Sequence, residues 1–178
     1  MFRRLTARTF VAACVLLIFL LASPQSATYP QSPPASPLDQ YKAHGYVNDF
    51  AGMIDAKTQA TLEQFCQQLD KDKQTQMVIV TVVSLEGMPI KPFATQLFNR
   101  WGIGDKETDR GVLILLSKND HQYRIATGFG MESTLPDDKC DRLGKKMVPL
   151  LRKRQYGDAL LLLVHDLAAE IQPQVTAR

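Results

Sequence analysis

This sequence is poor in the residue types on which most enzyme motifs depend. Its 178 residues include 3 Cys, 3 His and 1 Trp. It contains no G-x-x-x-x-G-K loop, no G-x-S-x-G turn and no H-E-x-x-H pair, which excludes the commonest NTPase, serine hydrolase and zinc protease signatures. The histidines, His44, His121 and His165, are far apart along the chain and form no ligand pattern. A hydrolytic enzyme built on this chain would need a metal-activated water, because no nucleophilic side chain is set beside a base.

The sequence also lacks a long apolar run. The longest, residues 10–22, has about 13 residues, whereas a membrane-spanning helix needs roughly 20. Arg3, Arg4 and Arg8 precede it, as in a secretory signal. We therefore expect residues 1–27 to export the protein, which would be periplasmic or secreted. An uncleaved N-terminal anchor is the alternative, because Pro24 follows the run and no clean A-x-A site is present. Membrane contact is expected only through such an anchor.

Net charge is nearly absent once this leader is set aside. The chain has 21 Lys and Arg against 18 Asp and Glu, and three of the arginines lie in the leader. The balanced remainder argues against a nucleic-acid partner. A local group of basic residues remains on a predicted helix and at its end: Lys145, Lys146, Arg152, Lys153 and Arg154. These side chains either form an ordinary solvated surface or contact an anionic membrane or a phosphate group.

Only two cysteines, Cys66 and Cys140, lie beyond the leader. An exported protein can form a disulfide, and an even pair is compatible with one. Both cysteines occupy apolar helical positions, so two separately buried small side chains are the other interpretation. They form no metal-binding motif.

Composition divides the rest of the chain. Residues 28–43 are rich in Pro, Ser and Gln and are expected to be a linker. Residues 44–173 are long enough for one domain with a substantial core, and residues 174–178 are expected to be a disordered tail.

Apolar spacing predicts the elements of this domain. Helical periodicity begins after Asp55, a candidate N-cap, and recurs around residues 93–101, 143–151 and 160–171. Pro149 is expected to kink or interrupt the third of these helices. Buried strands are expected at 77–83 and 112–116, the latter paired antiparallel with 123–127. A further short strand is expected near 46–49 or after Gly128. The fold class is therefore α/β: a three-layer α/β/α sandwich with a Rossmann-like mixed sheet and about four helices.

Several segments resemble the TPM domain family of exported or membrane-tethered α/β domains. They are V-N-D-F-A-G-M-I at 47–54, M-V-I-V-T-V at 77–82, the helix 93–101 ending in G-I-G-D-K, D-R-G-V-L at 109–113, G-F-G-M-E at 128–132 and L-P-D-D at 135–138. The resemblance covers nearly the whole predicted domain. Arg110 departs from the family pattern, in which Asn or Asp is commoner.

The resemblance implies a Rossmann-like sheet, divalent cation binding in some members and acid phosphatase activity in one plant member. Other members are accessory or assembly factors of membrane complexes. The usual transmembrane segment and glycine-rich tail after the domain are not found in this sequence.

Four carboxylates in predicted loops are the candidate metal ligands: Asp49, Asp105, Asp109 and Glu132. Carboxylate oxygens suit Ca²⁺ or Mg²⁺, so convergence of these side chains at strand ends would make a cation site. Surface turns and caps are the other interpretation, because loop carboxylates commonly have those roles.

Two further features invite a ligand. Gly128 and Gly130 would let backbone N–H groups approach an anion, although tight turns use the same residues. Trp101 precedes the acidic loop and is either a core aromatic or a stacking surface.

Two functions follow from these features. The first is an exported module, with or without a bound divalent cation, that assists or repairs an envelope or membrane complex through a protein partner. The second is a weak metal-dependent acid phosphatase using Asp49, Asp109 and Glu132.

Overall fold

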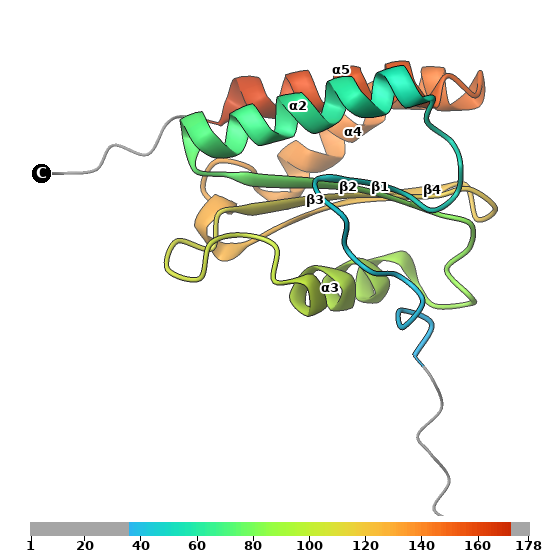
Figure 1. The fold of residues 1–178 in the computed structure, drawn as a ribbon, viewed down its shortest axis with the longest axis horizontal. Coiled ribbons are helices and arrows are strands. Elements are labelled where there is room, and N and C mark those ends of the chain that lie inside the picture. The colour runs from blue at the N-terminus through green and yellow to red at the C-terminus, as the bar shows by residue number, and fades with distance from the viewer. Residues whose placement is uncertain (1–35, 172–178) are drawn as a thin grey trace, which may run out of the picture. The chain divides into compact units, whose positions relative to one another are not determined.

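A four-stranded mixed sheet forms the centre of the domain in the computed structural model, which describes residues 36–171 (Figure 1). The strand order is β1 (Val47–Asp49), β2 (Gln76–Val82), β3 (Gly111–Ser117) and β4 (Gln122–Thr127). The first three are parallel, and β4 pairs antiparallel with β3 through a short turn. The expected additional strand is β1, whereas Gly128 is followed by a 3-10 helix, η1 (Phe129–Met131).

Helices cover both faces of the sheet. α2 (Ala56–Lys73), α4 (Asp137–Arg152) and α5 (Tyr156–Glu170) lie on one face, and α3 (Ile90–Trp101) lies on the other (Figure 1). The Asp55 carboxylate caps α2 by accepting from the Thr58 N–H at 3.0 Å. The α/β sandwich with four helices is thus confirmed, and α4 continues through Pro149.

Strand β3 lies between two apolar cores, one on each face of the sheet, and this position explains its composition. Val112, Ile114 and Leu116 face the α2, α4 and α5 layer, whereas Leu113 and Leu115 face α3. All five are at most 2% exposed. Because both faces are covered, the strand is a continuous apolar run, and each such side chain contributes roughly 1.5–3 kcal/mol by leaving water.

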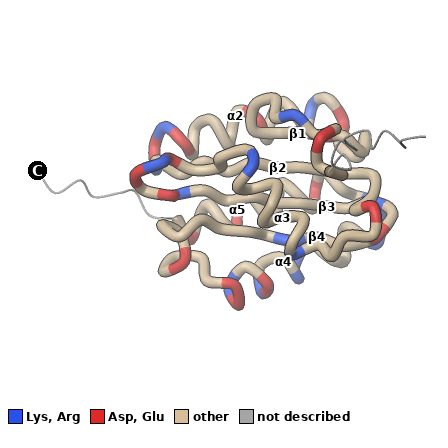
Figure 2. Tube along the Cα trace, turned by 90° about the horizontal axis from the view of Figure 1, so that it is seen from below, with Lys and Arg blue, Asp and Glu red and all other residues tan. Residues whose placement is uncertain are grey.

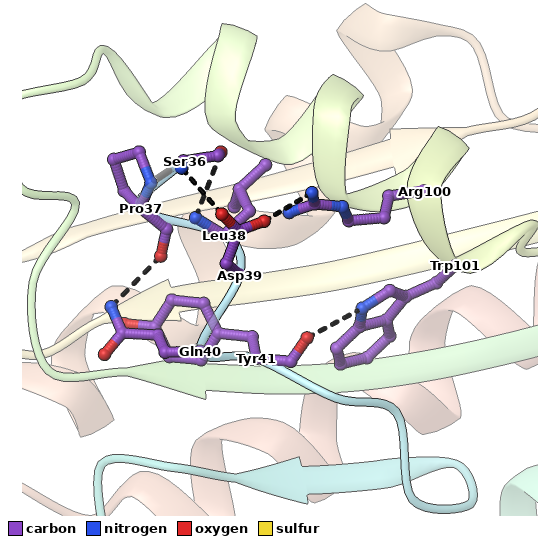
Figure 3. A network of polar contacts seen from close by, with 8 residues as sticks. All are labelled: Ser36, Pro37, Leu38, Asp39, Gln40, Tyr41, Arg100 and Trp101. Atoms are coloured by element: carbon purple, nitrogen blue, oxygen red, sulfur yellow. Dashed lines mark hydrogen bonds and ion pairs between the residues drawn. The ribbon is translucent and has the colours of Figure 1, made fainter. Parts of the chain in front are cut away.

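The start of the described chain packs against α3 (Figure 3). Leu38 and Tyr41 are only 2% and 8% exposed. The Asp39 carboxylate pairs with Arg100 at 2.5 Å, and the Trp101 indole N–H donates to the Tyr41 carbonyl at 3.4 Å. Part of the predicted linker 28–43 therefore belongs to the folded unit, and Trp101 is a partly buried aromatic packed against the core on the α3 side of the sheet.

Two acidic side chains of α2 fix the start of the edge strand β1. The carboxylate of Glu63 accepts hydrogen bonds from the backbone N–H groups of Tyr46 at 3.0 Å and Val47 at 2.8 Å. The Tyr46 hydroxyl also donates to Asp70 on the same helix at 2.8 Å. These bonds hold the amino end of β1 in its register with β2.

The cysteines are not bonded to each other. Cys66 on α2 and Cys140 on α4 are free and buried in the structure, which corresponds to the second of the two interpretations, two separately buried small side chains. Burial raises the pKa of Cys66 to about 12 and that of Cys140 to about 11.

The leader 1–27 and the tail 174–178 lie outside the described residues. Among residues 36–171, no helix has the length and hydropathy needed to cross a membrane.

Candidate functional site

The four candidate carboxylates lie at opposite ends of the sheet. Asp49 ends β1, and its position pairs with Thr81 near the end of β2. The loop containing Asp105 and Asp109 leads into β3, whose first residue, Gly111, pairs with the first residue of β2. Glu132 follows β4, which runs back toward the start of β3 (Figure 1). The structure therefore places Asp105, Asp109 and Glu132 at the amino ends of the parallel strands and Asp49 at their carboxyl ends.

Asp49 fixes the loop between β1 and α2. Its two carboxylate oxygens accept from the backbone N–H groups of Met53 and Ile54, each at 2.9 Å, and one also accepts from the Thr81 hydroxyl. Both oxygens are thus used by the protein itself, as expected of a loop-closing carboxylate.

Asp105 closes a turn of its own loop. One carboxylate oxygen accepts from the N–H groups of Glu107 at 2.9 Å and Thr108 at 3.1 Å. These bonds favour the ionised form and lower the pKa of Asp105, which is exposed. The turn continues to Asp109, whose N–H donates to the Asp105 carbonyl at 2.7 Å.

Asp109 connects this turn to the loop after β4. Its backbone is left-handed, with φ 48°, a conformation that Asp tolerates better than most residues. Its carboxylate accepts from the Phe129 N–H at 2.7 Å, and its carbonyl accepts from the Gly130 N–H at 3.2 Å. The loop predicted to hold an anion thus holds a carboxylate of the same chain.

The glycines make this close approach possible. A Cβ atom on Gly130 would lie 1.9 Å from the Thr108 carbonyl oxygen, and one on Gly128 would lie 2.3 Å from the Asp109 carbonyl oxygen. Only glycine leaves room for the two loops to pack backbone against backbone. The Gly128 N–H donates to the Gly111 carbonyl at 2.9 Å, so Gly128 and Gly130 both use their N–H groups within the domain.

The neighbouring Arg110 is also structural. Its guanidinium donates to the Lys73 and Gln74 carbonyls, at 3.4 and 3.3 Å, and to the Thr75 hydroxyl at 3.0 Å. It therefore ties the acidic loop to the turn between α2 and β2.

The resulting surface, here called the acidic edge, consists of the loop residues Asp105, Asp109, Phe129 and Glu132. The Phe129 side chain is 79% exposed although its backbone is hydrogen-bonded to Asp109. Glu132 is exposed and follows η1. Charged residues of both signs lie along the loops at this end of the domain (Figure 2).

The four predicted ligands do not fit one cation, since Asp49 lies at the other end of the sheet. Among residues 36–171, no three His, Cys, Asp or Glu side chains are close enough to hold a metal ion. A Ca²⁺ ion takes six to eight oxygens. A site at the acidic edge would have to rely on Asp105 and Asp109, which share one turn, and on carbonyls or water.

A pocket of about 500 Å³ opens at the carboxyl end of β3. Its charged lining comes from the β3–β4 turn and from the end of α4, and we call it the basic pocket: Lys118, His121, Arg152 and Arg154. The sequence showed Arg152 and Arg154 within a basic group but did not indicate their neighbours from the β3–β4 turn. The direction in which α4 crosses the sheet decides that contact, and spacing along the chain does not report it.

Comparison with known proteins supports the fold. The N-terminal domain of a protein from P. gingivalis matches with a TM-score of 0.67 at 22% identity, covering 75% of this chain and 88% of that one. The N-terminal domain of a Corynebacterium glutamicum protein matches with a TM-score of 0.59 at 14% identity, covering 84% and 90%. A protein from the psychrophilic Bizionia argentinensis matches with a TM-score of 0.56 at 13% identity, covering 70% and 88%.

Sequence comparison adds the family. No curated protein matches this sequence significantly. The family model described as the TPM domain matches residues 47–170, a span that contains every strand and helix described above. The chain therefore belongs to the TPM domain family.

Proposed function

We propose that this protein is an exported binding module that assists a membrane or envelope complex, and that the acidic edge is its contact surface for a protein partner. The observation that supports this proposal is that most of the candidate carboxylates hold loops of the domain in place. Those of Asp49, Asp105 and Asp109 accept backbone hydrogen bonds that fix loops, and at the acidic edge the fixed loop presents an exposed Phe129.

Rigidity makes such a surface effective. Aromatic side chains supply much of the binding energy in protein interfaces, and a loop whose backbone is already fixed loses less conformational freedom on binding. The backbone of Phe129 is held by its N–H bond to Asp109 and by the Glu132 N–H, which donates to its carbonyl at 3.2 Å.

The charge around Phe129 specifies the partner's chemistry. Asp105, Glu107, Asp109 and Glu132 outnumber Lys106 on these loops, while Arg110 points its guanidinium at carbonyls of the α2–β2 turn. A complementary partner would offer an apolar socket bordered by Lys or Arg.

Site-specific crosslinking tests this contact. A photoreactive residue at position 129 should capture a protein of the envelope complex in intact cells, whereas one at Val83, an exposed apolar position outside the acidic edge, should not. Phe129→Ala should abolish co-purification of the captured protein with an unchanged melting temperature. Capture of the same protein from both positions, or co-purification that survives Phe129→Ala, would contradict the proposed surface.

Export is part of the same proposal and has its own test. The arginine-flanked run at residues 10–22 supports it. Cell fractionation followed by N-terminal sequencing should place the protein outside the cytoplasm. A mature start near residue 28 would indicate a cleaved signal, and an intact N-terminus in the membrane fraction would indicate an anchor. Protein confined to the cytoplasm would contradict export.

Weak metal-dependent phosphatase activity is the second candidate. The observation in its favour is that Asp105 and Asp109 share a turn and that one oxygen of each accepts no hydrogen bond within residues 36–171. These two carboxylates would hold Ca²⁺ or Mg²⁺, and the bound cation would supply an activated water for attack on the phosphate ester.

A matched pair of variants decides between the two candidates. Phosphate release from p-nitrophenyl phosphate and calorimetric titration with Ca²⁺ and Mg²⁺ should be compared for the native protein, Asp109→Asn and Asp72→Asn. Asp72 is an exposed carboxylate on α2 and controls for net charge. The binding module predicts no metal-dependent turnover in any of them. Turnover that needs the cation and is lost only in Asp109→Asn would establish the phosphatase.

A further inference from the structure

The basic pocket concentrates positive charge that no carboxylate of its lining balances. Lys118 and His121 come from the β3–β4 turn, and Arg152 and Arg154 come from the end of α4. No Asp or Glu is among the described residues that line the pocket. Within residues 36–171, Lys118, Arg152 and Arg154 form no ion pair. Like charges gathered at one pocket repel, and an anion between them relieves that repulsion.

Two local contacts leave this charge in place. The Lys118 ammonium donates to the Ala51 carbonyl at 3.0 Å, which positions it and leaves further donors. Asp120, in the same turn as His121 and attracted to it, accepts from the Ser117 hydroxyl at 2.5 Å and from the Leu85 N–H at 2.8 Å. One oxygen of its carboxylate thus accepts both hydrogen bonds, and Asp120 does not line the pocket.

The rest of the lining is largely apolar. Met53, Leu116, Val148 and Leu151 contribute aliphatic surface, and aromatic rings come from the tyrosines at 123 and 156. A volume of about 500 Å³ is within the usual range for small-molecule sites. A bare inorganic anion would leave the aliphatic wall in contact with water, so the lining favours a ligand that carries its charge on an apolar body.

Arg154 occupies a backbone position that glycine usually takes. The N–H of Arg154 donates to the Leu151 carbonyl at 2.9 Å and that of Gln155 to the Leu150 carbonyl at 3.0 Å. This is the Schellman turn that ends a helix, and its left-handed position is usually glycine. Here that position is Arg154, with φ 59°. His121 across the pocket is also left-handed, with φ 52°. The chain thus keeps two cationic or titratable side chains where glycine would be less strained.

We propose that the basic pocket binds a small dianion attached to an apolar body, with Arg152, Arg154 and Lys118 holding the charged group and the aliphatic wall holding the body. Two negative charges match the three permanent positive charges better than one, and guanidinium groups suit planar or tetrahedral oxyanions. The assignment concerns binding at the carboxyl ends of the parallel strands, the usual place for ligands in open α/β sheets. It does not depend on the acidic edge, which lies at the other end.

Calorimetry with a graded set of probes tests the assignment. 1-Naphthyl phosphate carries both a dianion and an aromatic body, 1-naphthoate has one charge, 1-naphthol has none, and inorganic phosphate has no body. We expect saturable binding of 1-naphthyl phosphate to the native protein and affinities at least about tenfold lower for the other three. Equal affinity for 1-naphthol, or no binding of 1-naphthyl phosphate by folded protein, would overturn the proposal.

Variants locate the binding. Arg152→Gln and Arg154→Gln should each lower the affinity for 1-naphthyl phosphate about tenfold or more. Lys153→Gln is the matched control, because it removes the same charge between these two positions without lining the pocket. Arg154→Gly should raise the melting temperature and still weaken binding, which separates lost binding from lost folding. An equal loss in Lys153→Gln would show general charge attraction and overturn the proposal.

A last arm identifies the source of the dianion. Vesicles of phosphatidylcholine with phosphatidic acid offer the same chemistry on a membrane. Sedimentation with these vesicles that is lost in Arg152→Gln and kept in Lys153→Gln would assign a lipid headgroup. Binding of 1-naphthyl phosphate without sedimentation would assign a soluble ligand, and both results support the pocket.

Discussion

The carboxylate of Asp109 accepts a 2.7 Å hydrogen bond from the backbone N–H of Phe129, and this bond joins the loop before β3 to the loop after β4. Strands β3 and β4 are antiparallel neighbours, so the start of β3 and the end of β4 lie at the same end of the sheet. A residue that suggests metal chemistry in the sequence is therefore a structural acceptor in the fold.

Replacing Asp109 should separate its acceptor role from its charge. Asp109→Ala removes the acceptor for Phe129 and places alanine at a positive φ, so we expect a loss of about 2–3 kcal/mol in the free energy of unfolding. Asp109→Asn keeps an acceptor and a residue that tolerates this φ, and should lose less than about 1 kcal/mol. Urea unfolding measures both, and equal losses would show that the hydrogen bond contributes little.

Gly130→Ala should destabilise the domain through a backbone clash. The new Cβ would lie 1.9 Å from the Thr108 carbonyl oxygen, so the two loops must separate. We expect a loss of about 3 kcal/mol. Gly87→Ala is the control, because Gly87 has φ 78° and nothing within 4 Å of a Cβ, so only the conformational cost of about 1 kcal/mol applies. Similar losses in the two variants would contradict the close packing of the loops.

The cysteines should react as buried thiols. Burial is the first cause of the raised pKa values of Cys66 and Cys140, so little thiolate is present at pH 8. A thiol reagent such as DTNB should label neither cysteine in the folded protein within minutes and both after addition of denaturant. Absence of labelling in the unfolded, unreduced protein would instead indicate a disulfide.

Asp120 should contribute to stability only above its titration range. The hydrogen bonds from the Ser117 hydroxyl and then the Leu85 N–H lower its pKa below the ordinary 3.8. The ionised form is therefore favoured by folding, and its contribution is complete above pH 3.8 and is lost as the pH falls through the folded value. The difference in melting temperature between the native protein and Asp120→Asn should shrink in that range. A difference that is constant down to pH 2 would contradict this.

The periodicity of apolar residues in the sequence was sufficient to predict most of the fold. The apolar runs that became β2 and β3 are buried on both faces, and the helical faces of α2, α3, α4 and α5 repeat their apolar residues every three or four positions. Leu38 and Tyr41 could not be recognised as core residues, because two apolar side chains in a proline-rich segment give no period.

The candidate site was harder to predict because it depends on strand direction. The expectation that Asp49 would lie close to Asp105 and Asp109 did not distinguish the amino ends of the strands from their carboxyl ends. The loop before a parallel strand and the loop after it lie at opposite ends of the sheet, which separates Asp49 from the other two. Contacts between the β3–β4 turn and the end of α4 depend on how helices cross the sheet, and local pattern carries no such information.

The hydrogen bonds that Glu63 accepts from the start of β1 also affect how readily two molecules associate. An edge strand offers unpaired N–H groups to which another chain can add, and long flat edges are the sites of amyloid-like association. Here the edge strand spans only Val47–Asp49, and the N–H groups of Tyr46 and Val47 are already bonded to a helix side chain. A second molecule therefore finds few free donors along β1, and Glu63 protects the β1 edge of the sheet against intermolecular strand pairing.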